Sequence, residues 1–258
     1  MDLGLHGLRV MVSAGASGIG LAIARAFERE GARVSVCDVD AAALAALAQS
    51  DPALRTQRCD VSQRAEVARW FDAALASLGG LDCLVNNAGI AGPTGTVDAI
   101  DPDEWDRCIA VDLTGQFNCV RLAVPALRES KNASIVNVSS LAGRLGFALR
   151  TPYAAAKWGV IGLMRSLAVE LGPDNIRVNA LLPGIVAGER QKRVLAAKAQ
   201  ARGVTIDEIE RAAFAGTSIK QYVTAEQLAD YVVFLASARA ATISGQALSV
   251  CGDTNILS

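Results

Sequence analysis

The chain has 258 residues, of which 52% are hydrophobic and 20% charged, with 25 Lys and Arg against 26 Asp and Glu. This composition supports a large buried core and excludes an intrinsically disordered chain. The formal net charge of −1 provides no electrostatic basis for binding nucleic acid or an anionic membrane, so we expect neither as a partner. No apolar run is long enough to cross a bilayer, and the first residues lack the basic region of a signal peptide, so we expect a cytoplasmic protein.

The counts of histidine and cysteine exclude two further kinds of site. The sequence has one histidine, His6, and a Ser-His-Asp hydrolase or a histidine-ligated zinc site would have to be built around it. We therefore predict neither, and no metal ion. The six cysteines show no C-x-x-C spacing, which favours buried free thiols in a reducing compartment.

Short apolar runs rich in β-branched residues alternate with Ala- and Leu-rich segments of helical length along the whole chain. Because most of the short runs are apolar throughout, they predict strands of a parallel sheet that is covered on both faces. In chain order, the predicted strands are residues 9–12, 33–37, 55–59, 83–85, 134–138, 177–181 and 246–250, and the clearest predicted helices are residues 19–30, 61–78, 102–128 and 153–171. This alternation predicts a doubly wound α/β fold with a seven-stranded parallel sheet and helices on both faces.

Capping signals mark several helix starts. Asp101 precedes a proline at the first helical position, and Thr205 and Thr224 each begin a capping box. No internal repeat, linker or low-complexity tract interrupts the sequence, so we predict one domain over residues 1–258. Residues 185–223, between the sixth and seventh strands, are predicted to form a helical insert that binds the substrate.

The first predicted strand runs into a turn of small residues that leads directly into a helix. Small residues let the backbone approach a pyrophosphate, and the free N–H groups at the helix start favour its negative charge. A tight structural turn without a ligand is the alternative. The candidate cofactor-binding residues here are Ser13, Gly15, Ser17, Gly18, Ile19 and Gly20.

Polar residues follow the next three predicted strands. Asp38 lies 18 residues after Gly20, where a carboxylate accepts hydrogen bonds from the ribose hydroxyls of NAD and repels the 2′-phosphate of NADP. Asp60, followed by Val61, is placed to reach the adenine; capping of the next helix is the alternative role for both acids. Asn87, Ala88 and Gly89 follow the fourth strand, and they are predicted to line the cofactor-binding crevice at the carboxyl ends of the strands.

Tyr153 and Lys157 lie four residues apart, so they share one face of a predicted helix. A phenol in water loses its proton only near pH 10, but an ammonium held close favours the phenolate, which can then take a proton from an alcohol. For this spacing alone, a surface pair is the alternative. Ser140 precedes Tyr153 by 13 residues and follows a predicted strand, at the edge of the sheet where such folds place their sites.

The turn of small residues, Asn86-Asn87-Ala88-Gly89, the Ser140, Tyr153 and Lys157 set and Pro183-Gly184 occur in this order, and together they resemble the short-chain dehydrogenase/reductase family. The resemblance covers nearly the whole chain and implies a single Rossmann-type domain. It implies that Ser140 polarises the substrate oxygen, that Tyr153 is the acid and base, and that Lys157 holds the ribose hydroxyls and supports the phenolate.

The same resemblance implies further contacts and an assembly. The backbone at Pro183, Gly184 and Val186 would contact the nicotinamide. The family most often forms homotetramers, or else homodimers, and the helices near residues 102–130 and 153–171 would lie in the interfaces.

Three positions depart from the family pattern. Ala14 replaces the first glycine of the turn, Gly188 stands where a threonine is expected, and Asp112 stands where an asparagine is expected. In the family, that asparagine holds a water that links the catalytic lysine to solvent. Asp112 has two open roles, either holding the same water or acting as a negative charge beside Lys157, and we include it among the predicted catalytic residues.

Basic residues gather where the substrate would bind. Arg144 and Arg150 lie between Ser140 and Tyr153, and residues 190–202 carry five basic side chains and no acid. An anionic substrate, such as a hydroxy acid or a sugar acid, would bind such residues through charge-assisted hydrogen bonds. The predicted substrate residues are Arg144, Arg150 and Arg190, and a solvated helix face is the alternative for residues 190–202.

Two other functions stay open at this point. An NADPH-dependent 3-oxoacyl thioester reductase would use the same catalytic residues, although Asp38 disfavours NADPH. A silent nucleotide-sensing protein would keep the fold, but such proteins commonly lose the tyrosine or the lysine, and both are present. The sequence therefore predicts an NAD-dependent oxidoreductase that acts on a small secondary alcohol or ketone, and it does not name the alcohol.

Overall fold

A computed structural model describes residues 2–257 and contains one parallel sheet with the strand order β3-β2-β1-β4-β5-β6-β7. The chain begins in the middle of the sheet, adds two strands on one side of β1, and then returns to add four on the other side. Every predicted strand is present, with ends that differ by at most two residues. The strands are β1 (Arg9–Ser13), β2 (Arg33–Asp38), β3 (Arg55–Arg58), β4 (Cys83–Asn86), β5 (Ser134–Val138), β6 (Arg177–Pro183) and β7 (Ala247–Val250).

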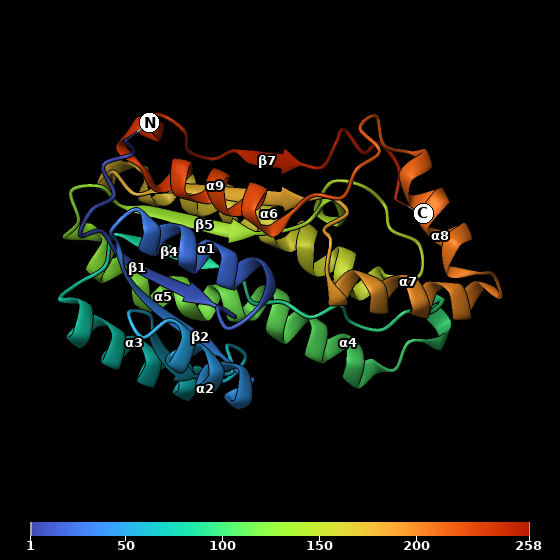
Figure 1. Cartoon of the computed structure of the whole chain (residues 1–258), viewed down its shortest axis with the longest axis horizontal. Coiled ribbons are helices and arrows are strands. Elements are labelled where there is room, and N and C mark those ends of the chain that lie inside the picture. The colour runs from blue at the N-terminus through green and yellow to red at the C-terminus, as the bar shows by residue number, and fades with distance from the viewer. Residues whose placement is uncertain (1, 258) are drawn as a thin grey trace.

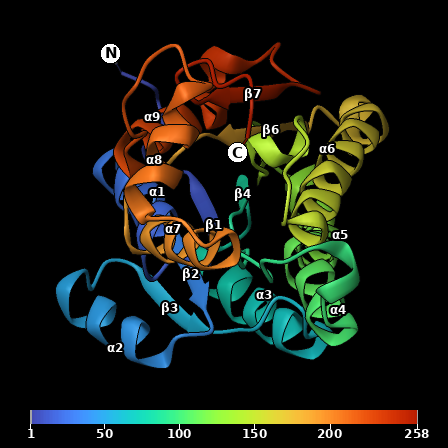
Figure 2. The ribbon, with the colours of Figure 1, turned by 90° about the vertical axis from the view of Figure 1, so that its right-hand side faces the viewer.

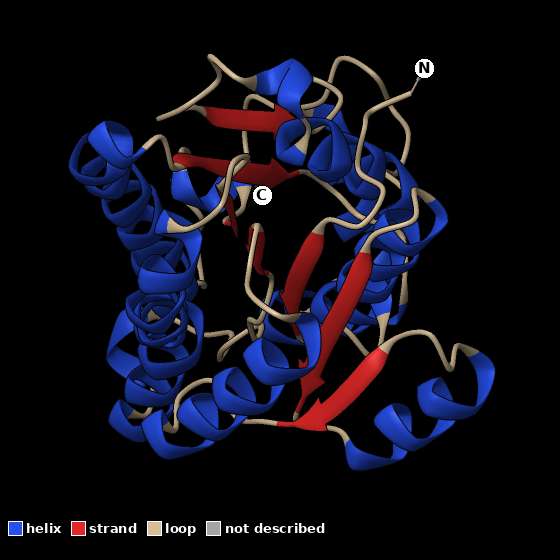
Figure 3. Cartoon of the chain, turned by 90° about the vertical axis from the view of Figure 1, so that its left-hand side faces the viewer, coloured by secondary structure: helices blue, strands red, loops and turns tan. Residues whose placement is uncertain are grey.

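Helices cover both faces of the sheet, as predicted (Figure 2, Figure 3). On one face, α1 and α9 bury a core that includes Phe27 and Leu228; on the other, α3, α5 and α6 bury a core that includes Trp70 and Phe71. The helices are α1 (Gly18–Arg29), α2 (Ala41–Ser50), α3 (Arg64–Leu78), α4 (Pro102–Ile109), α5 (Gly115–Arg128), α6 (Thr151–Leu171), α7 (Glu189–Arg202), α8 (Ile206–Ala215) and α9 (Ala225–Ala236).

Two predicted helices differ from the observed ones for local reasons. Helix α3 begins at Arg64 rather than at residue 61, because Asp60 accepts hydrogen bonds from the Ser62 amide at 2.9 Å and its hydroxyl at 2.7 Å and holds a turn. The predicted helix 102–128 is α4 and α5 joined by one wider π-helical turn, η2 (Ala110–Thr114). Such turns recur at functional sites, and this one contains Asp112.

The carboxyl ends of the strands face the helical insert. In Figure 1 the arrowheads of β1, β5 and β7 point toward the end of the molecule at which α7 and α8 lie. These two helices occupy the predicted insert 185–223, and Leu195, Ala199 and Ile209 form a small core between them. Both capping boxes, at Thr205 and Thr224, are present. Within residues 2–257, no helix is long and apolar enough to cross a membrane. The single domain over residues 1–258 stays a prediction, and its two end residues lie outside the described range.

A hydrogen-bonded ion pair between Arg9 and Asp82 connects the amino ends of β1 and β4, at the end of the sheet away from α7 and α8. Asp82, which precedes β4, accepts hydrogen bonds from the Arg9 amide at 2.9 Å, from its guanidinium at 2.7 and 2.8 Å, and from the Ser130 hydroxyl at 2.6 Å. Burial alone would raise the pKa of Asp82, but the hydrogen bonds from Arg9 and Ser130 outweigh it and hold the pKa below its usual value.

We expect Asp82→Asn to lower the free energy of unfolding at pH 7 by about 2–3 kcal/mol, because an amide cannot match this set of donors. Since the pKa of Asp82 is lowered by folding, its stabilising contribution is present above the pKa of an unfolded aspartate and is lost as the pH falls through the folded value. Urea unfolding at neutral and acidic pH checks this. The difference between the two proteins should narrow below about pH 4, and equal stabilities at pH 7 would contradict the role of Asp82.

Candidate functional site

A cleft of about 980 Å³ lies at the carboxyl ends of the strands, and α7 and α8 contribute to its lining. It brings together residues from widely separated stretches of the sequence. The predicted site residues that line it are Ser17, Gly18, Ile19, Asp38, Asp60, Val61, Asn87, Ala88, Gly89, Ser140, Arg150, Tyr153, Lys157, Pro183, Gly184, Val186 and Arg190. The remaining ones, Ser13, Gly15, Gly20, Asp112 and Arg144, do not line the cleft.

The small residues of the first turn are needed because other parts of the protein pack closely against them, and not only because a ligand would contact them. A Cβ on Gly20 would lie 2.1 Å from the Ala14 carbonyl oxygen, and one on Gly15 would lie 2.7 Å from the Cβ of Val36. The Ser13 hydroxyl accepts hydrogen bonds from the amides of Asn87 and Ala88, both at 3.0 Å. Ser13, Gly15 and Gly20 therefore do not line the cleft themselves. They support the turn and the segment that follows β4, which do.

Ala14, which replaces the family's glycine, has a left-handed backbone with φ of +50°. This region costs an L-residue about 1–2 kcal/mol, whereas glycine adopts it freely. We expect Ala14→Gly to raise the melting temperature by about 2–4 °C, because the relief of strain exceeds the added freedom of the unfolded chain by about 1 kcal/mol. Gly18, in the same turn, has φ of +54°, so Gly18→Ala is the matched reverse change and should lower the melting temperature. A decrease with Ala14→Gly, measured by calorimetry, would contradict this explanation.

Two carboxylates, those of Asp38 and Asp60, line the cleft. Asp38 is half-buried and accepts hydrogen bonds from the amides of Ala16 and Asp40, each at 3.1 Å. Helix α2 is capped instead by Asp40, which accepts from the Ala43 amide at 3.0 Å, so Asp38 is not the helix cap. Asp60 likewise does not cap α3, whose cap position is Gln63.

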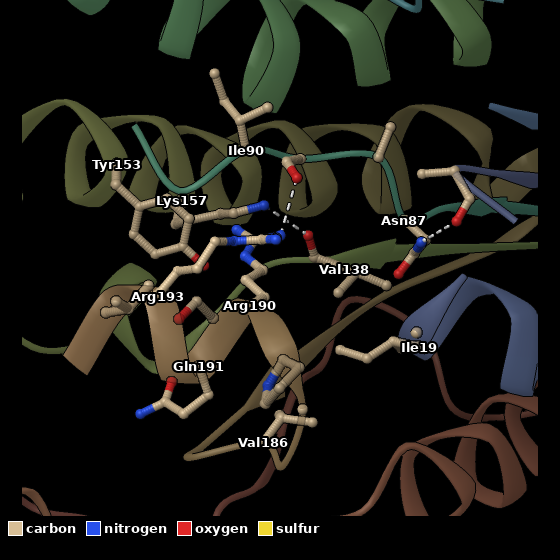
Figure 4. Close-up of a pocket in the computed structure, with 18 of the residues that line it drawn as sticks. Ile19, Asn87, Ile90, Val138, Tyr153, Lys157, Val186, Arg190, Gln191 and Arg193 are labelled. Carbon is tan, nitrogen blue, oxygen red and sulfur yellow. Dashed lines mark hydrogen bonds between the residues drawn. The ribbon is translucent and has the colours of Figure 1, made fainter. Parts of the chain in front are cut away.

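A buried ion pair, of which one member lines the cleft, lies beside Tyr153. The Lys157 side chain is 2% exposed; its Nζ donates to the Val138 carbonyl at 3.2 Å and lies 3.4 Å from Oδ2 of Asp112. Asp112 is fully buried, and its Oδ1 accepts from the Ile90 amide at 2.7 Å. The Lys157 ammonium is also 5.5 Å from the centre of the Tyr153 ring. Figure 4 shows Tyr153, Lys157 and Arg190 together, with Ile19 and Asn87 at the opposite end of the cleft.

Neighbouring serines connect β5 to this group. The Ser140 hydroxyl lines the cleft and accepts from the Ala142 amide at 3.2 Å. The Ser139 hydroxyl donates to the Lys157 carbonyl at 2.8 Å, and so ties the end of β5 to α6. The sequence prediction missed Ser139, although a second serine beside Ser140 was a usable signal.

Arg150 lies buried beside the tyrosine. Only 2% of it is exposed, and burial lowers the pKa of its guanidinium. The guanidinium carbon is 5.2 Å from the centre of the Tyr153 ring and 5.4 Å from that of Phe147. One nitrogen, Nη2, donates to the Ala91 carbonyl, whereas Nε and Nη1 have no hydrogen-bond partner within residues 2–257.

Some basic residues of α7 lie in the cleft and others lie on the surface. Arg190 donates to the Gly89 carbonyl at 2.9 Å and lies 5.9 Å from the Tyr153 ring centre. Lys198 is 3% exposed and lies 3.9 Å from the Phe147 ring centre; burial, and then repulsion by Arg150 and Arg202, lower its pKa to about 7. Lys192 instead pairs with Glu189 on the surface. Only part of α7 is therefore a solvated helix face.

Arg144, a predicted substrate residue, lies away from the other predicted site residues. Its side chain is exposed outside the cleft and donates to the Ser249 hydroxyl on β7 at 3.3 Å. The short helical turn that Ser140 caps, Leu141–Gly143, separates the two residues. His6 is also exposed and outside the cleft. Within the described residues, no group of three or more His, Cys, Asp or Glu side chains is arranged to hold a metal ion.

The C-terminal residues Ile256 and Leu257 complete the lining, and Leu257 pairs with Phe147 in an isolated β-bridge. Nothing in their sequence indicated a place in the site, because two apolar residues near a chain end form no pattern. Of the five buried cysteines, Cys59 lines the cleft, and the pKa of Cys108 is raised to about 12 by burial and by the charge of Asp112.

Comparisons with known proteins agree with this geometry. A family profile described as enoyl-(acyl carrier protein) reductase matches residues 13–253. The chain is 36% identical over 248 residues to a probable galactose dehydrogenase, GalD, of Rhizobium meliloti (94% of this chain, 93% of the relative). It is 34% identical over 247 residues to D-beta-hydroxybutyrate dehydrogenase of Cupriavidus necator (93% and 95%).

Solved structures give the same result. A variant of actinorhodin polyketide ketoreductase with NADPH superposes with a TM-score of 0.89 at 32% identity, over 94% of this chain and 95% of that one. Levodione reductase superposes with a TM-score of 0.86 at 30% identity, over 96% and 97%. The chain therefore belongs to the short-chain dehydrogenase/reductase family, whose members are oxidoreductases that bind a nicotinamide cofactor and act on small molecules.

Proposed function

We propose that this protein is an NAD-dependent dehydrogenase or reductase that interconverts a secondary alcohol and the corresponding ketone. The observation that carries the proposal is the distribution of groups within one cleft. Ile19, in the turn of small residues, lies at one end and Tyr153 and Lys157 at the other (Figure 4), and Asp38 and Ser140 line the same cleft.

The residues at the first end fit a dinucleotide. The turn before α1 has no room for side chains at Gly15 and Gly20, and the helix N-terminus beyond it favours a pyrophosphate. The neighbours of Asp38 in the cleft lining are Val39 and Asp40, and neither supplies a cation for the 2′-phosphate of NADP. A solved relative holds NADPH; for this chain, the carboxylate of Asp38 supports NAD.

In the oxidation direction, Tyr153 as phenolate takes the hydroxyl proton of the alcohol, and Ser140 holds the same oxygen by a hydrogen bond. When bound, the nicotinamide supplies the acceptor for the hydride that leaves the carbinol carbon. The Lys157 ammonium places a positive charge 5.5 Å from the centre of the Tyr153 ring. Of the two roles open for Asp112, the 3.4 Å contact with Lys157 supports a direct counter-charge rather than the holding of a relay water.

The names of the relatives leave the substrate class divided between a neutral sugar, a hydroxy acid and a polyketide. The arginines that line the cleft, among them Arg150 and Arg190, favour an anionic substrate such as a hydroxy acid or a sugar acid. A 3-oxoacyl thioester reductase is the second candidate, because a ketoreductase is among the structural neighbours.

For assembly and location, we propose a cytoplasmic homotetramer or homodimer. Large apolar side chains are exposed on the helices that would form the interfaces: Trp105 on α4, Phe117 on α5, and Trp158 and Val169 on α6. Exposed apolar groups of this size on neighbouring helices support a protein interface.

The test of the proposed function is a panel of secondary alcohols, hydroxy acids, sugars and sugar acids, each supplied with NAD and followed by the absorbance of NADH. We expect at least one compound to be oxidised. If a protein shown by fluorescence titration to bind NADH oxidises none of them, and reduces none of the matching ketones or 3-oxoacyl thioesters, the proposed function is wrong.

A further inference from the structure

Arg150 is a buried cation whose hydrogen bonds are incomplete. Its Nε carries one N–H bond and its Nη1 carries two, and none of these has a partner within residues 2–257. Arg177, the other buried arginine, shows the usual arrangement, because its Nη1 and Nη2 donate to Asn132 and to the carbonyls of Leu235, Ala236 and Ala240. A buried guanidinium with unmatched donors is costly, so the contrast points to a ligand that completes the set.

The surroundings of Arg150 determine the charge of that ligand. A second arginine, Arg190, lines the same cleft, and the guanidinium carbons of Arg150 and Arg190 lie 5.2 and 5.9 Å from the centre of the Tyr153 ring. The buried acid nearby, Asp112, is already engaged by Lys157 and the Ile90 amide. A planar oxyanion suits the guanidinium donors best, because charge-assisted hydrogen bonds from arginine match the geometry of a carboxylate.

The position of Arg150 also determines the length of the ligand. Its guanidinium carbon is 5.2 Å from the centre of the Tyr153 ring, whose hydroxyl is the proposed proton acceptor. A carboxylate bound to Arg150 and an alcohol at Tyr153 therefore belong to one short molecule. On the basis of the proposed function, we propose that Arg150 binds the substrate carboxylate, and that the substrate is a short 2- or 3-hydroxy acid or the matching oxo acid.

Matched acid and amide pairs test this inference, because they differ in charge but hardly in shape. The probes are lactate with lactamide and 3-hydroxybutyrate with 3-hydroxybutyramide, each with NAD. For at least one pair, wild-type kcat/KM should favour the acid by about a hundredfold, and Arg150→Met should remove that preference while changing the value for the amide only a few-fold. Arg150→Lys, which keeps the charge, should restore part of the preference. Arg144→Met removes an arginine outside the cleft and is the matched control.

The outcomes of this experiment distinguish a failure of the inference from a failure of the proposed function. If neutral secondary alcohols are oxidised but neither acid is preferred over its amide, the inference is wrong and the proposed function stands. If the acid is preferred but Arg150→Met does not change the ratio, another residue binds the carboxylate and the inference is again wrong. If nothing is oxidised although NADH binds, both are wrong.

A second measurement keeps the inference testable if Arg150→Met fails to fold. Acetate should inhibit the oxidation of the better amide by the wild-type protein, competitively with respect to the amide, because it occupies Arg150 without supplying an alcohol. Acetamide should not inhibit at the same concentration. Equal inhibition by the two compounds, or inhibition by neither, would overturn the assignment of a carboxylate site to Arg150.

Discussion

Tyr153→Phe is expected to lower kcat by about a thousandfold or more, since it removes the proton acceptor while keeping the ring. The phenyl ring retains its place beside Arg150 and Lys157, whose charged groups lie 5.2 and 5.5 Å from the ring centre. NAD binding should therefore change little. Steady-state rates combined with titration of NADH fluorescence measure the two effects separately.

Two comparisons make this result specific. Tyr231 lies on α9 outside the cleft, so Tyr231→Phe is the matched control and should leave both measurements unchanged. Lys157→Ala should instead weaken both turnover and cofactor binding, because one ammonium is proposed to serve the phenolate and the ribose. Substantial activity in the Tyr153→Phe protein would refute the proton-transfer role of Tyr153.

Asp112→Asn is expected to lower the free energy of unfolding by about 3 kcal/mol, because it leaves the buried Lys157 ammonium without its counter-ion. The amide cannot replace the carboxylate at both contacts. If its oxygen accepts from the Ile90 amide, its nitrogen faces the lysine; if its oxygen faces the lysine, its nitrogen faces the Ile90 amide. Thermal unfolding of the two proteins measures this loss, and Asp106→Asn, at an exposed position on α4, is the matched control.

The same substitution should move the pH dependence of activity. Without the Asp112 charge, the net positive charge beside Tyr153 increases, so the pH profile of kcat/KM for alcohol oxidation should differ from that of the wild type. The turnover at the optimum should change by less than about tenfold. An unchanged profile would favour the relay-water role, and a loss of more than about a hundredfold with intact NAD binding would imply that the carboxylate takes part directly in the chemistry.

Most strands were predictable because they are buried on both faces and therefore read as largely apolar runs, whereas the edge strand β3 is polar and partly exposed. Helix α2 was not among the clearest predicted helices, because it is mostly alanine and buries only Leu44 and Leu47, which gives weak periodicity. The start of α3 was placed too early because the Asp60–Ser62 hydrogen bonds form a turn that composition does not reveal. These differences concern the end of one helix and a helix whose apolar periodicity is weak.

The site was predictable to the extent that its residues follow strands or share a helix face. Contacts between distant segments were not: Asp112 and Lys157 approach to 3.4 Å only because the π-helical turn and α6 pack together. For the same reason, the sequence treated Arg144 and Arg150 alike, whereas the structure exposes the first and buries the second beside Tyr153. Burial and packing separate residues that spacing cannot.

The ratio of kcat/KM for NAD to that for NADP, with one alcohol at one pH, tests most directly the claim that this cleft is an NAD-dependent active site. Because Asp38 would face the 2′-phosphate of NADP, we expect NAD to be preferred by about a hundredfold or more. Asp38→Ser should reduce that preference mainly by improving the value for NADP. A ratio near one, or a preference for NADP in the wild-type protein, would contradict the claim.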